Sequence, residues 1–167
     1  MKLTIALLSV LFFAVACTVS YKFTGANIDY SQVQTIAIRN FPNQADLVYP
    51  TLAQTFTDEL RNKYISQTRL RMVDTGADLE LEGEIIGYET TELAVTADAR
   101  ASQTRLTITV RVRYINNKKP SDDLEQNFSG YREYDNRQSL DQVQDELIRL
   151  IVNDLTDEIF NATLGNW

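Results

Sequence analysis

The sequence contains no histidine, a single cysteine, three prolines and six glycines. Without histidine, neither a serine–histidine–aspartate triad nor a cysteine–histidine pair can form, and zinc sites of the usual cysteine and histidine type are also excluded. A single cysteine excludes a disulfide within the chain. There is also no phosphate-binding loop, nucleophile elbow or dinucleotide fingerprint. We therefore predict that the protein is not an enzyme, has no catalytic or metal-binding residues and uses no cofactor.

An excess of positive charge is also missing. The 167 residues include 16 lysines and arginines against 23 aspartates and glutamates, which gives a formal net charge of −7. Proteins that bind nucleic acid usually carry a basic surface, so we predict no nucleic-acid partner. Hydrophobic residues make up 44% of the chain and charged residues 23%, which is typical of a globular protein. The length favours one domain, which we place at residues 35–167.

No hydrophobic run is long enough to cross a bilayer as a helix. The run from residue 3 to 15 carries no charge and is 13 residues long, whereas a transmembrane helix needs about 20. It follows Lys2 and ends in Ala14-Val15-Ala16-Cys17. A positive start, a short apolar run and small residues at its end are typical of a secretory signal peptide, which we assign to residues 1–16.

The end of this signal has two interpretations. Ala14 and Ala16 fit an ordinary cleavage site, which would leave a free cysteine. Alternatively, Ala14 to Cys17 resembles a bacterial lipobox, although the usual leucine three places before the cysteine is missing. We favour lipidation because the only cysteine stands where an acyl anchor requires it, and a free thiol would be reactive in an oxidising compartment. Loss of Lys2 with the signal lowers the net charge from −7 to −8, and residues 17–34 form the lipidated lead-in.

Hydrophobic spacing predicts the first elements of the domain. Residues 35–40 alternate as a strand does, and Pro42 ends it because proline cannot donate to a strand ladder. A helix is expected from Pro50, a favourable first helical position. Its apolar residues recur every four positions. These are Leu52, Phe56, Leu60 and Tyr64. A short strand is expected at residues 69–73.

Two longer segments predict neighbouring strands. Residues 78–89 alternate, with Leu79, Leu81, Gly83, Ile85 and Gly87 on one face and Glu80, Glu82 and Glu84 on the other. Residues 105–115 place Leu106, Ile108, Val110, Val112 and Tyr114 opposite Arg105, Arg111 and Arg113. An acidic face beside a basic face favours antiparallel pairing of the two strands.

The last two elements complete an α+β pattern. Residues 124–134 predict a third long strand. Ser139 and Gln142 form a capping box, and the helix that follows has apolar residues at spacings of three and four until Gly165. We predict two amphipathic helices packed on one face of a mainly antiparallel four-stranded sheet, with the charged sheet face open to solvent.

Candidate contact residues are basic. The polar loop around residues 90–103 carries Arg100 beside Arg105, and Lys118-Lys119 lies at the opposite hairpin end; either group could bind phosphate on a glycolipid. The glutamates at 80, 82 and 84 could form a carboxylate cluster, but we interpret them as a solvated strand face paired with Arg111 and Arg113. Asp78 with Asp98, or Asp122-Asp123, could bind a cation, and we interpret them as loop and turn residues.

Taken in order along the chain, several short segments resemble the LptE lipopolysaccharide-assembly lipoproteins in their Bacteroidetes form. The resemblance extends from Cys17 to Trp167, and no single segment is specific without the others. The segments are Tyr21-Lys22-Phe23-Thr24-Gly25-Ala26, Phe41-Pro42-Asn43, Pro50-Thr51-Leu52, Phe56-Thr57, Leu81-Glu82-Gly83-Glu84-Ile85, Gly87-Tyr88, Leu106-Thr107-Ile108-Thr109-Val110, Phe128-Ser129, Tyr134-Asp135, Ser139-Leu140, Asp145-Glu146-Leu147-Ile148 and Ile159-Phe160-Asn161.

This resemblance implies a fold of two helices on a four-stranded sheet. It also implies a protein anchored by its lipid to the periplasmic face of the outer membrane, where it plugs the LptD β-barrel, supports barrel assembly and helps to place lipopolysaccharide in the outer leaflet. Expected contacts with lipopolysaccharide or the barrel are basic, and the candidates are Arg100, Arg105, Arg111, Arg113, Lys118 and Lys119.

An alternative resemblance leads to a different function. The segment Ile36 to Phe41 is similar to the opening of TolB-amino-terminal and CsgG-like α/β domains. Lipoproteins with such domains act in secretion pores or activate peptidoglycan synthases. The partner distinguishes the two interpretations: a large barrel in the first, and a ring of identical subunits or a cell-wall enzyme in the second.

Overall fold

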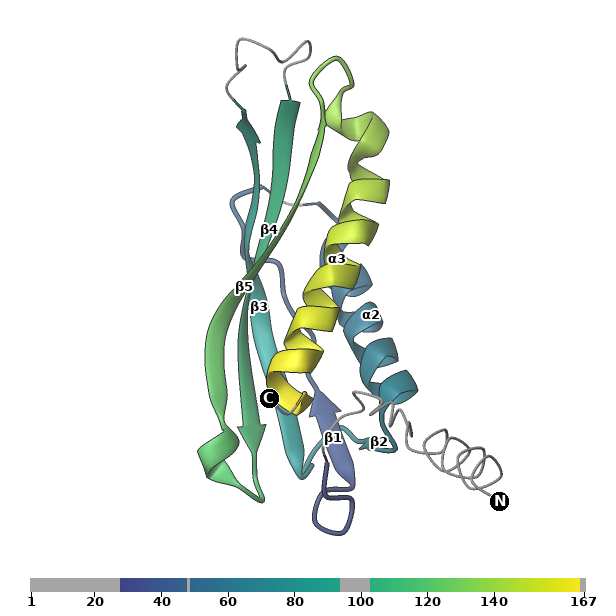
Figure 1. The fold of residues 1–167 in the computed structure, drawn as a ribbon, viewed down its shortest axis with the longest axis vertical. Coiled ribbons are helices and arrows are strands. Elements are labelled where there is room, and N and C mark those ends of the chain that lie inside the picture. Colours follow the sequence, from purple (N-terminus) through teal and green to yellow (C-terminus); the bar gives the residue numbers. More distant parts are fainter. Residues whose placement is uncertain (1–27, 48, 94–102, 166–167) are drawn as a thin grey trace, which may run out of the picture.

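Two helices lie along one side of a long, twisted sheet (Figure 1). The computed structural model describes residues 28–47, 49–93 and 103–165. Its elements, in chain order, are β1 (Thr35–Ile38), α2 (Leu52–Gln67), β2 (Arg71–Met72), β3 (Leu79–Glu92), β4 (Gln103–Asn116), the short 3-10 helix η2 (Pro120–Asp122), β5 (Leu124–Asp135) and α3 (Leu140–Leu164). The predicted α+β class and its two helices are confirmed.

The sheet has five strands, in the order β2-β1-β3-β4-β5. The prediction of a four-stranded sheet is therefore wrong. The sheet also includes β2, the short strand expected at residues 69–73, which has only two residues and pairs with Thr35 and Ile36 of β1. β1 runs parallel to both neighbours, whereas β3, β4 and β5 are antiparallel. The parallel pairs follow from α2, because a strand that returns through a helical crossover runs in the same direction as the first.

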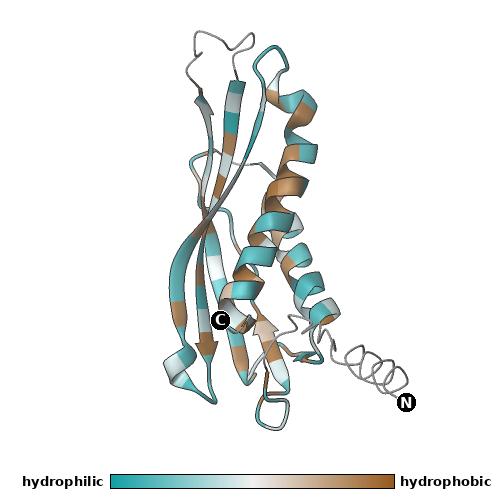
Figure 2. Ribbon diagram, in the orientation of Figure 1, coloured by the Kyte–Doolittle hydropathy of each residue, from teal (hydrophilic) through white to brown (hydrophobic). Residues whose placement is uncertain are grey.

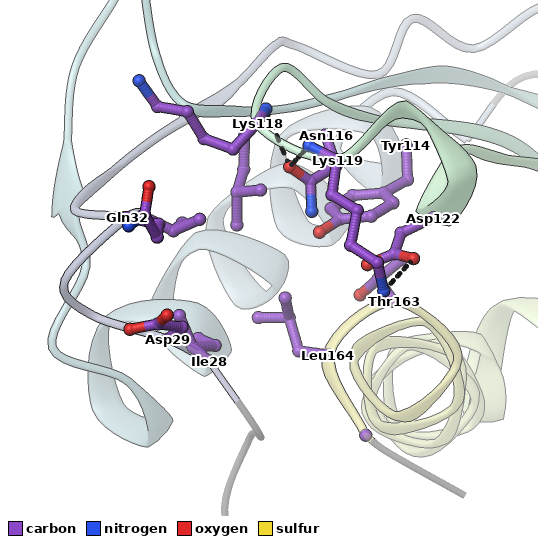
Figure 3. A pocket seen from close by; sticks show the side chains of 13 residues that line it. Ile28, Asp29, Gln32, Tyr114, Asn116, Lys118, Lys119, Asp122, Thr163 and Leu164 are labelled. Carbon is purple, nitrogen blue, oxygen red and sulfur yellow. Dashed lines mark hydrogen bonds and ion pairs between the residues drawn. The ribbon is translucent and has the colours of Figure 1, made fainter.

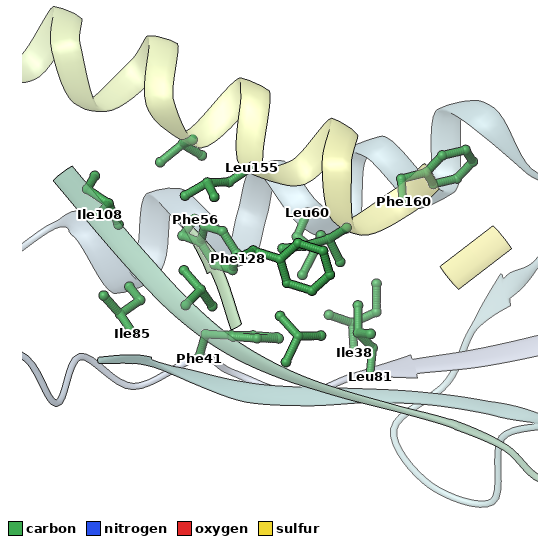
Figure 4. Close-up of a cluster of buried hydrophobic side chains, with 14 of the residues drawn as sticks. Ile38, Phe41, Phe56, Leu60, Leu81, Ile85, Ile108, Phe128, Leu155 and Phe160 are labelled. Carbon is green, nitrogen blue, oxygen red and sulfur yellow. The ribbon is translucent and has the colours of Figure 1, made fainter. Parts of the chain in front are cut away.

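The apolar stripe of α2 forms the centre of the core. Leu52, Phe56, Leu60 and Tyr64 are all fully buried, as their four-residue spacing predicts. Figure 4 shows Phe56 and Leu60 facing side chains from the sheet and from α3. The helix begins at Leu52, two residues after the predicted Pro50.

The long helix α3 covers the sheet beside α2. Its buried residues are Leu147, Ile148, Ile151, Val152, Leu155, Thr156, Ile159, Phe160 and Leu164. Figure 2 shows how hydrophobic and hydrophilic residues alternate along it, as an amphipathic helix requires. The predicted capping box is confirmed, with the side chain of Gln142 accepting a hydrogen bond from the Ser139 N–H at 3.3 Å.

A bulge interrupts the alternation of β3. Ile85 pairs with Val110 and Gly87 pairs with Thr109, so Ile86 has no partner on β4. The extra residue moves Gly87 to the open face of the sheet and turns Tyr88 toward the helices. The expectation that Gly87 shares a face with Ile85 is therefore wrong, and the side chain that packs inward is Tyr88, which is 6% exposed.

None of the helices within the described residues combines the length and the apolar character needed to cross a membrane.

Candidate functional site

The sheet face opposite the helices carries compensated charges. Arg111 lies opposite Glu84 in the β3–β4 register and binds it at 2.7 Å, and Arg113 binds Glu82 at 3.2 Å. The predicted pairing of an acidic with a basic strand is therefore confirmed. The arginine side chains are 49% and 57% exposed, and exposed pairs of this kind contribute about 0–1 kcal/mol each. Their main effect is to leave this face hydrophilic and locally neutral.

A second charged group lies farther along the same face. The Arg105 guanidinium binds Glu133 of β5 at 2.7 Å and lies 4.3 Å from the centre of the Tyr131 ring. Attraction between the cation and the ring adds to the ion pair. The sequence indicated Arg105 as a contact residue, but not Tyr131 or Glu133. Their signal was the alternation of residues 124–134, which places both side chains on the face that Arg105 shares.

Small hydroxyl side chains lie between the two charged groups, with Glu89 of β3 opposite Thr107. Thr109 and Ser129 are opposite each other on β4 and β5, and their hydroxyls are hydrogen-bonded at 2.9 Å. Gly87 faces Thr109 from β3, and Thr107 pairs with Tyr131. The open face therefore has charged groups at both ends and small hydroxyl side chains between them, a surface that suits polar contacts.

A pocket of about 370 Å³ lies at the base of the domain, where the chain first enters the described structure (Figure 3). Leu79, Tyr114 and Leu164 form apolar walls, and Lys118 and Lys119 contribute amines at its edge. Burial, with the nearby charge of Asp122, raises the pKa of Tyr114 to about 12, so this phenol stays neutral at physiological pH. The full lining is Ile28, Asp29, Gln32, Val33, Leu79, Tyr114, Asn116, Lys118, Lys119, Asp122, Thr163, Leu164 and Gly165.

Both lysines of the pocket are already paired. Lys118 binds Asp78 at 3.0 Å, and Lys119 binds Asp122 at 2.8 Å. Their side chains are 46% and 67% exposed, so either amine could exchange its carboxylate for an incoming phosphate at little cost. Both positive charges at the edge of the pocket are therefore paired, and an incoming phosphate could replace their carboxylate partners.

Asp78 is a structural residue at the start of the sheet. Its carboxylate accepts hydrogen bonds from the Gln34 N–H at 2.9 Å and from the Thr35 N–H and hydroxyl at 3.0 and 2.9 Å. The Gln34 N–H, followed by Lys118 and Thr35, holds the pKa of Asp78 well below its usual range. Asp123 likewise accepts the Asn116 N–H at 2.8 Å. Both aspartates therefore accept hydrogen bonds from backbone N–H groups at the ends of strands. This structural role is consistent with their interpretation as loop and turn residues.

The basic residues that the sequence singled out fall into two groups. Arg105, Arg111 and Arg113 share the open face of β4, whereas Lys118 and Lys119 follow the end of β4 at the base. Cys17, Asp98 and Arg100 lie outside the described residues. Within the described ranges, no cluster of three or more acidic, histidine or cysteine side chains is arranged to hold a metal ion.

The family model for LptE, described as lipopolysaccharide-assembly, matches residues 33–163. The chain belongs to the LptE lipopolysaccharide-assembly family. The match includes β1 to β5 and nearly all of α3. LptE proteins assemble lipopolysaccharide and are not enzymes, which agrees with the prediction from the missing catalytic residues.

Solved structures share the fold at low sequence identity. A hypothetical protein from Chlamydia trachomatis superposes with a TM-score of 0.54 and 11% identity, covering 80% of this chain and 99% of that one. An uncharacterized lipoprotein B from Nitrosomonas europaea gives 0.53 and 14%, covering 76% and 79%. A protein from Xanthomonas campestris gives 0.51 and 11%, covering 84% and 91%. No curated protein matches the chain significantly.

Proposed function

We propose that this LptE-family protein is an outer-membrane lipoprotein, anchored through Cys17 at the periplasmic face, that plugs the LptD β-barrel and supports insertion of lipopolysaccharide into the outer leaflet. The family match over residues 33–163 supports a role in lipopolysaccharide assembly. The signal-like residues 1–16 followed by the only cysteine support the anchor. The narrower resemblance to the Bacteroidetes form stays a prediction.

The observation that carries the barrel partnership is the open sheet face. A domain held inside a barrel must present a hydrophilic surface, because barrel lumens are polar. Arg111 and Arg113 are paired with Glu84 and Glu82 on this face. Beside them, the hydroxyls of Thr109 and Ser129 are hydrogen-bonded to each other. Such a surface can approach a polar wall without leaving a buried charge unpaired.

Direct contact with lipopolysaccharide would have to be local. A net charge of −8 after removal of the signal repels an anionic glycolipid over long distances. Only basic side chains that can leave their present partners would bind its phosphates, and Lys118 and Lys119 at the basal pocket meet this condition. We therefore include these two lysines in the proposal as the phosphate contacts, with Arg100 and Arg105 as further candidates.

Charge reversal on the open face tests the barrel partnership. The double variant Arg111→Glu and Arg113→Glu places new carboxylates beside Glu84 and Glu82, while the exposed positions leave the core intact. Tagged protein is recovered from outer membranes in mild detergent, and the proteins that accompany it are identified by mass spectrometry. We expect the wild type to retain one large barrel at near-equal amounts and the double variant to lose at least four-fifths of it.

A matched control reverses two arginines elsewhere. Arg137 and Arg149 are 81% and 65% exposed and bind only nearby carboxylates, so their reversal changes the net charge equally but should leave barrel recovery unchanged. Full recovery by a folded Arg111→Glu and Arg113→Glu variant would exclude the open face as the barrel contact. Recovery of a ring of identical subunits or a peptidoglycan synthase would instead favour the TolB-like or CsgG-like function. The intact mass of the same sample shows whether Cys17 carries acyl chains.

A further inference from the structure

The outer edge of β5 is a long strand edge. Among the residues that the structure describes, β5 pairs with β4 on one side only and ends the sheet. Its 12 residues contain no proline, and the register with β4 is continuous from Leu124 to Asp135, without a bulge. Proteins usually protect such an edge with proline, a bulge or a short strand, because it can pair with another chain.

The register identifies which backbone groups point outward. The Leu93 N–H donates to the Gln103 carbonyl, so odd-numbered residues of β4 bond to β3 and even-numbered residues bond to β5. Ile108 lies opposite Gly130, and Leu106 lies opposite Arg132. Even-numbered residues of β5 therefore bond to β4.

The groups that remain belong to the odd-numbered residues of β5. Ser129, Tyr131 and Glu133 direct their N–H and C=O groups away from the sheet, as the alternation of an antiparallel ladder requires. Within the described residues, no backbone hydrogen bond from another segment reaches these groups. The edge therefore presents three consecutive donor and acceptor positions of the kind that a further strand would use.

This edge forms one wall of an open groove. The groove holds about 490 Å³ and is lined by the consecutive residues 129–133 of β5 and by Asp154, Leu155 and Glu158 of α3. Gly130 is among these residues, and a Cβ atom there would meet Ile151 Cγ2 at 2.9 Å and Leu155 Cγ at 3.1 Å. The groove is thus a backbone edge beside a helix, and it is open to a segment in extended conformation.

An arginine of the protein itself shows what the groove accepts. The Arg132 guanidinium donates to the Tyr131 carbonyl at 2.9 Å and binds Asp154 across the groove at 2.5 Å. Tyr131 supplies one of the outward acceptors, so a cationic donor already occupies part of the position that a partner would use. Asp154 remains 50% exposed, which leaves room for a second cation.

The charge of the lining selects the partner. Asp154 and Glu158 of α3 line the groove together with one guanidinium, that of Arg132, whereas Glu133 is paired with Arg105 on the open face. The helix side of the groove therefore has an excess of one negative charge. A second copy pairing β5 with β5 would bring two acidic grooves together, which like charges oppose. A basic segment would instead gain ion pairs in addition to the main-chain hydrogen bonds.

We propose that the outer edge of β5 between Ser129 and Glu133 is a docking site for an extended, lysine- or arginine-rich segment of another protein, which adds to the sheet as a sixth strand. Main-chain hydrogen bonds give such strand addition its affinity, and side chains give its specificity. The segment replaces Arg132 at the Tyr131 carbonyl and directs its own cations to Asp154 and Glu158. This inference does not depend on the barrel partnership proposed above.

A proline at position 131 tests the site. Tyr131→Pro removes one outward N–H but no bond to β4, and proline is tolerated at an edge position of this kind. The matched control Tyr131→Ala removes the same ring and keeps the N–H. Binding to the purified full chain is measured by fluorescence anisotropy with a labelled nine-residue peptide of alternating lysine and valine. A peptide of alternating glutamate and valine serves as the charge control.

We expect the basic peptide to bind the wild type and Tyr131→Ala with affinities within threefold of each other, and Tyr131→Pro at least tenfold more weakly. Glu158→Lys should weaken binding at least fivefold, and the acidic peptide should not bind. Equal binding by the proline and alanine variants, or no binding of the basic peptide, would overturn the proposal. So would a concentration-dependent dimer in sedimentation that the proline abolishes. If Tyr131→Pro does not fold, the binding of the basic peptide to Glu158→Lys tests the proposal instead, and affinity equal to that of the wild type would overturn it.

Discussion

The ring of Phe41 occupies the space that a side chain on Gly83 would need. A Cβ atom at Gly83 would lie 2.5 Å from Phe41 Cε1 and 2.1 Å from the carbonyl oxygen of Arg111. Phe41 is buried and packs edge-on against Phe56 of α2, with 5.2 Å between ring centres. The glycine in β3 therefore allows the aromatic pair to reach the sheet, and packing rather than backbone conformation requires it.

Replacing this glycine should destabilise the domain strongly. Gly83→Ala forces Phe41 or the β4 backbone to move, and overpacking of a buried site costs about 3 kcal/mol. Gly87→Ala is the matched control in the same strand, because its Cβ would meet Thr109 Cβ at 3.2 Å on the open face, and we expect it to cost less than about 1 kcal/mol. Urea unfolding measures both, and similar losses in the two variants would show that the Phe41 contact is not decisive.

Asp78 should make the free energy of unfolding decrease as the pH falls into the acidic range. Its pKa is lowered in the folded protein by the Gln34 N–H, Lys118 and Thr35, so its contribution is present above its ordinary pKa of 3.8 and is lost as the pH falls through the lower folded value. We expect Asp78→Asn to cost about 2 kcal/mol at pH 7. Below pH 4, the wild type loses this advantage and the difference between the two proteins shrinks.

The measurement compares urea unfolding of wild type and Asp78→Asn at pH 7 and pH 3. Asp58→Asn serves as the control, since Asp58 makes only a 3.9 Å contact with Arg61 and is 55% exposed. Its cost should be small at both pH values. A difference for Asp78→Asn that stays constant between pH 7 and pH 3 would contradict the role of the ionised carboxylate.

A buried hydrogen bond is one of the contacts that join the two helices. Tyr64 of α2 is fully buried, and its hydroxyl lies 2.5 Å from Thr163 Oγ1 of α3, which itself donates to the Ile159 carbonyl. Tyr64→Phe removes this bond and should cost about 1 kcal/mol, whereas Tyr64→Ala also removes the ring packed against Phe160 and should cost about 4 kcal/mol. Calorimetric unfolding distinguishes them, and equal costs would mean that the ring contributes nothing beyond its hydroxyl.

The sequence predicted what depends on local spacing and on charge. The stripe of Leu52, Phe56 and Leu60 indicated α2 because these residues recur once per turn, and they are fully buried. The facing rows of glutamates and arginines indicated the β3–β4 pair because opposite charges favour it, and the register places Arg111 opposite Glu84.

What the sequence did not reveal depends on contacts between distant segments. The bulge at Ile86 lies where the chain after β1 joins β3: the Ile85 N–H donates to the Pro42 carbonyl at 2.9 Å, and the Gln44 N–H donates to the Ile85 carbonyl at 2.8 Å. No periodicity within residues 78–89 carries that information. The basal pocket likewise combines walls from Ile28, Leu79, Lys118 and Leu164, which lie far apart along the chain.

The position of Ile28 at the basal pocket sets the orientation that an anchor would impose. Ten residues lie between Cys17 and Ile28, and the eleven steps from one Cα atom to the other span at most about 40 Å when fully extended. β3 leads away from the base for 14 residues, or roughly 46 Å. In a protein tethered at Cys17, the basal pocket and its lysines would therefore lie at the end of the domain nearer the membrane. The ends of β3 and β4 that are farther from the base would extend away from the membrane.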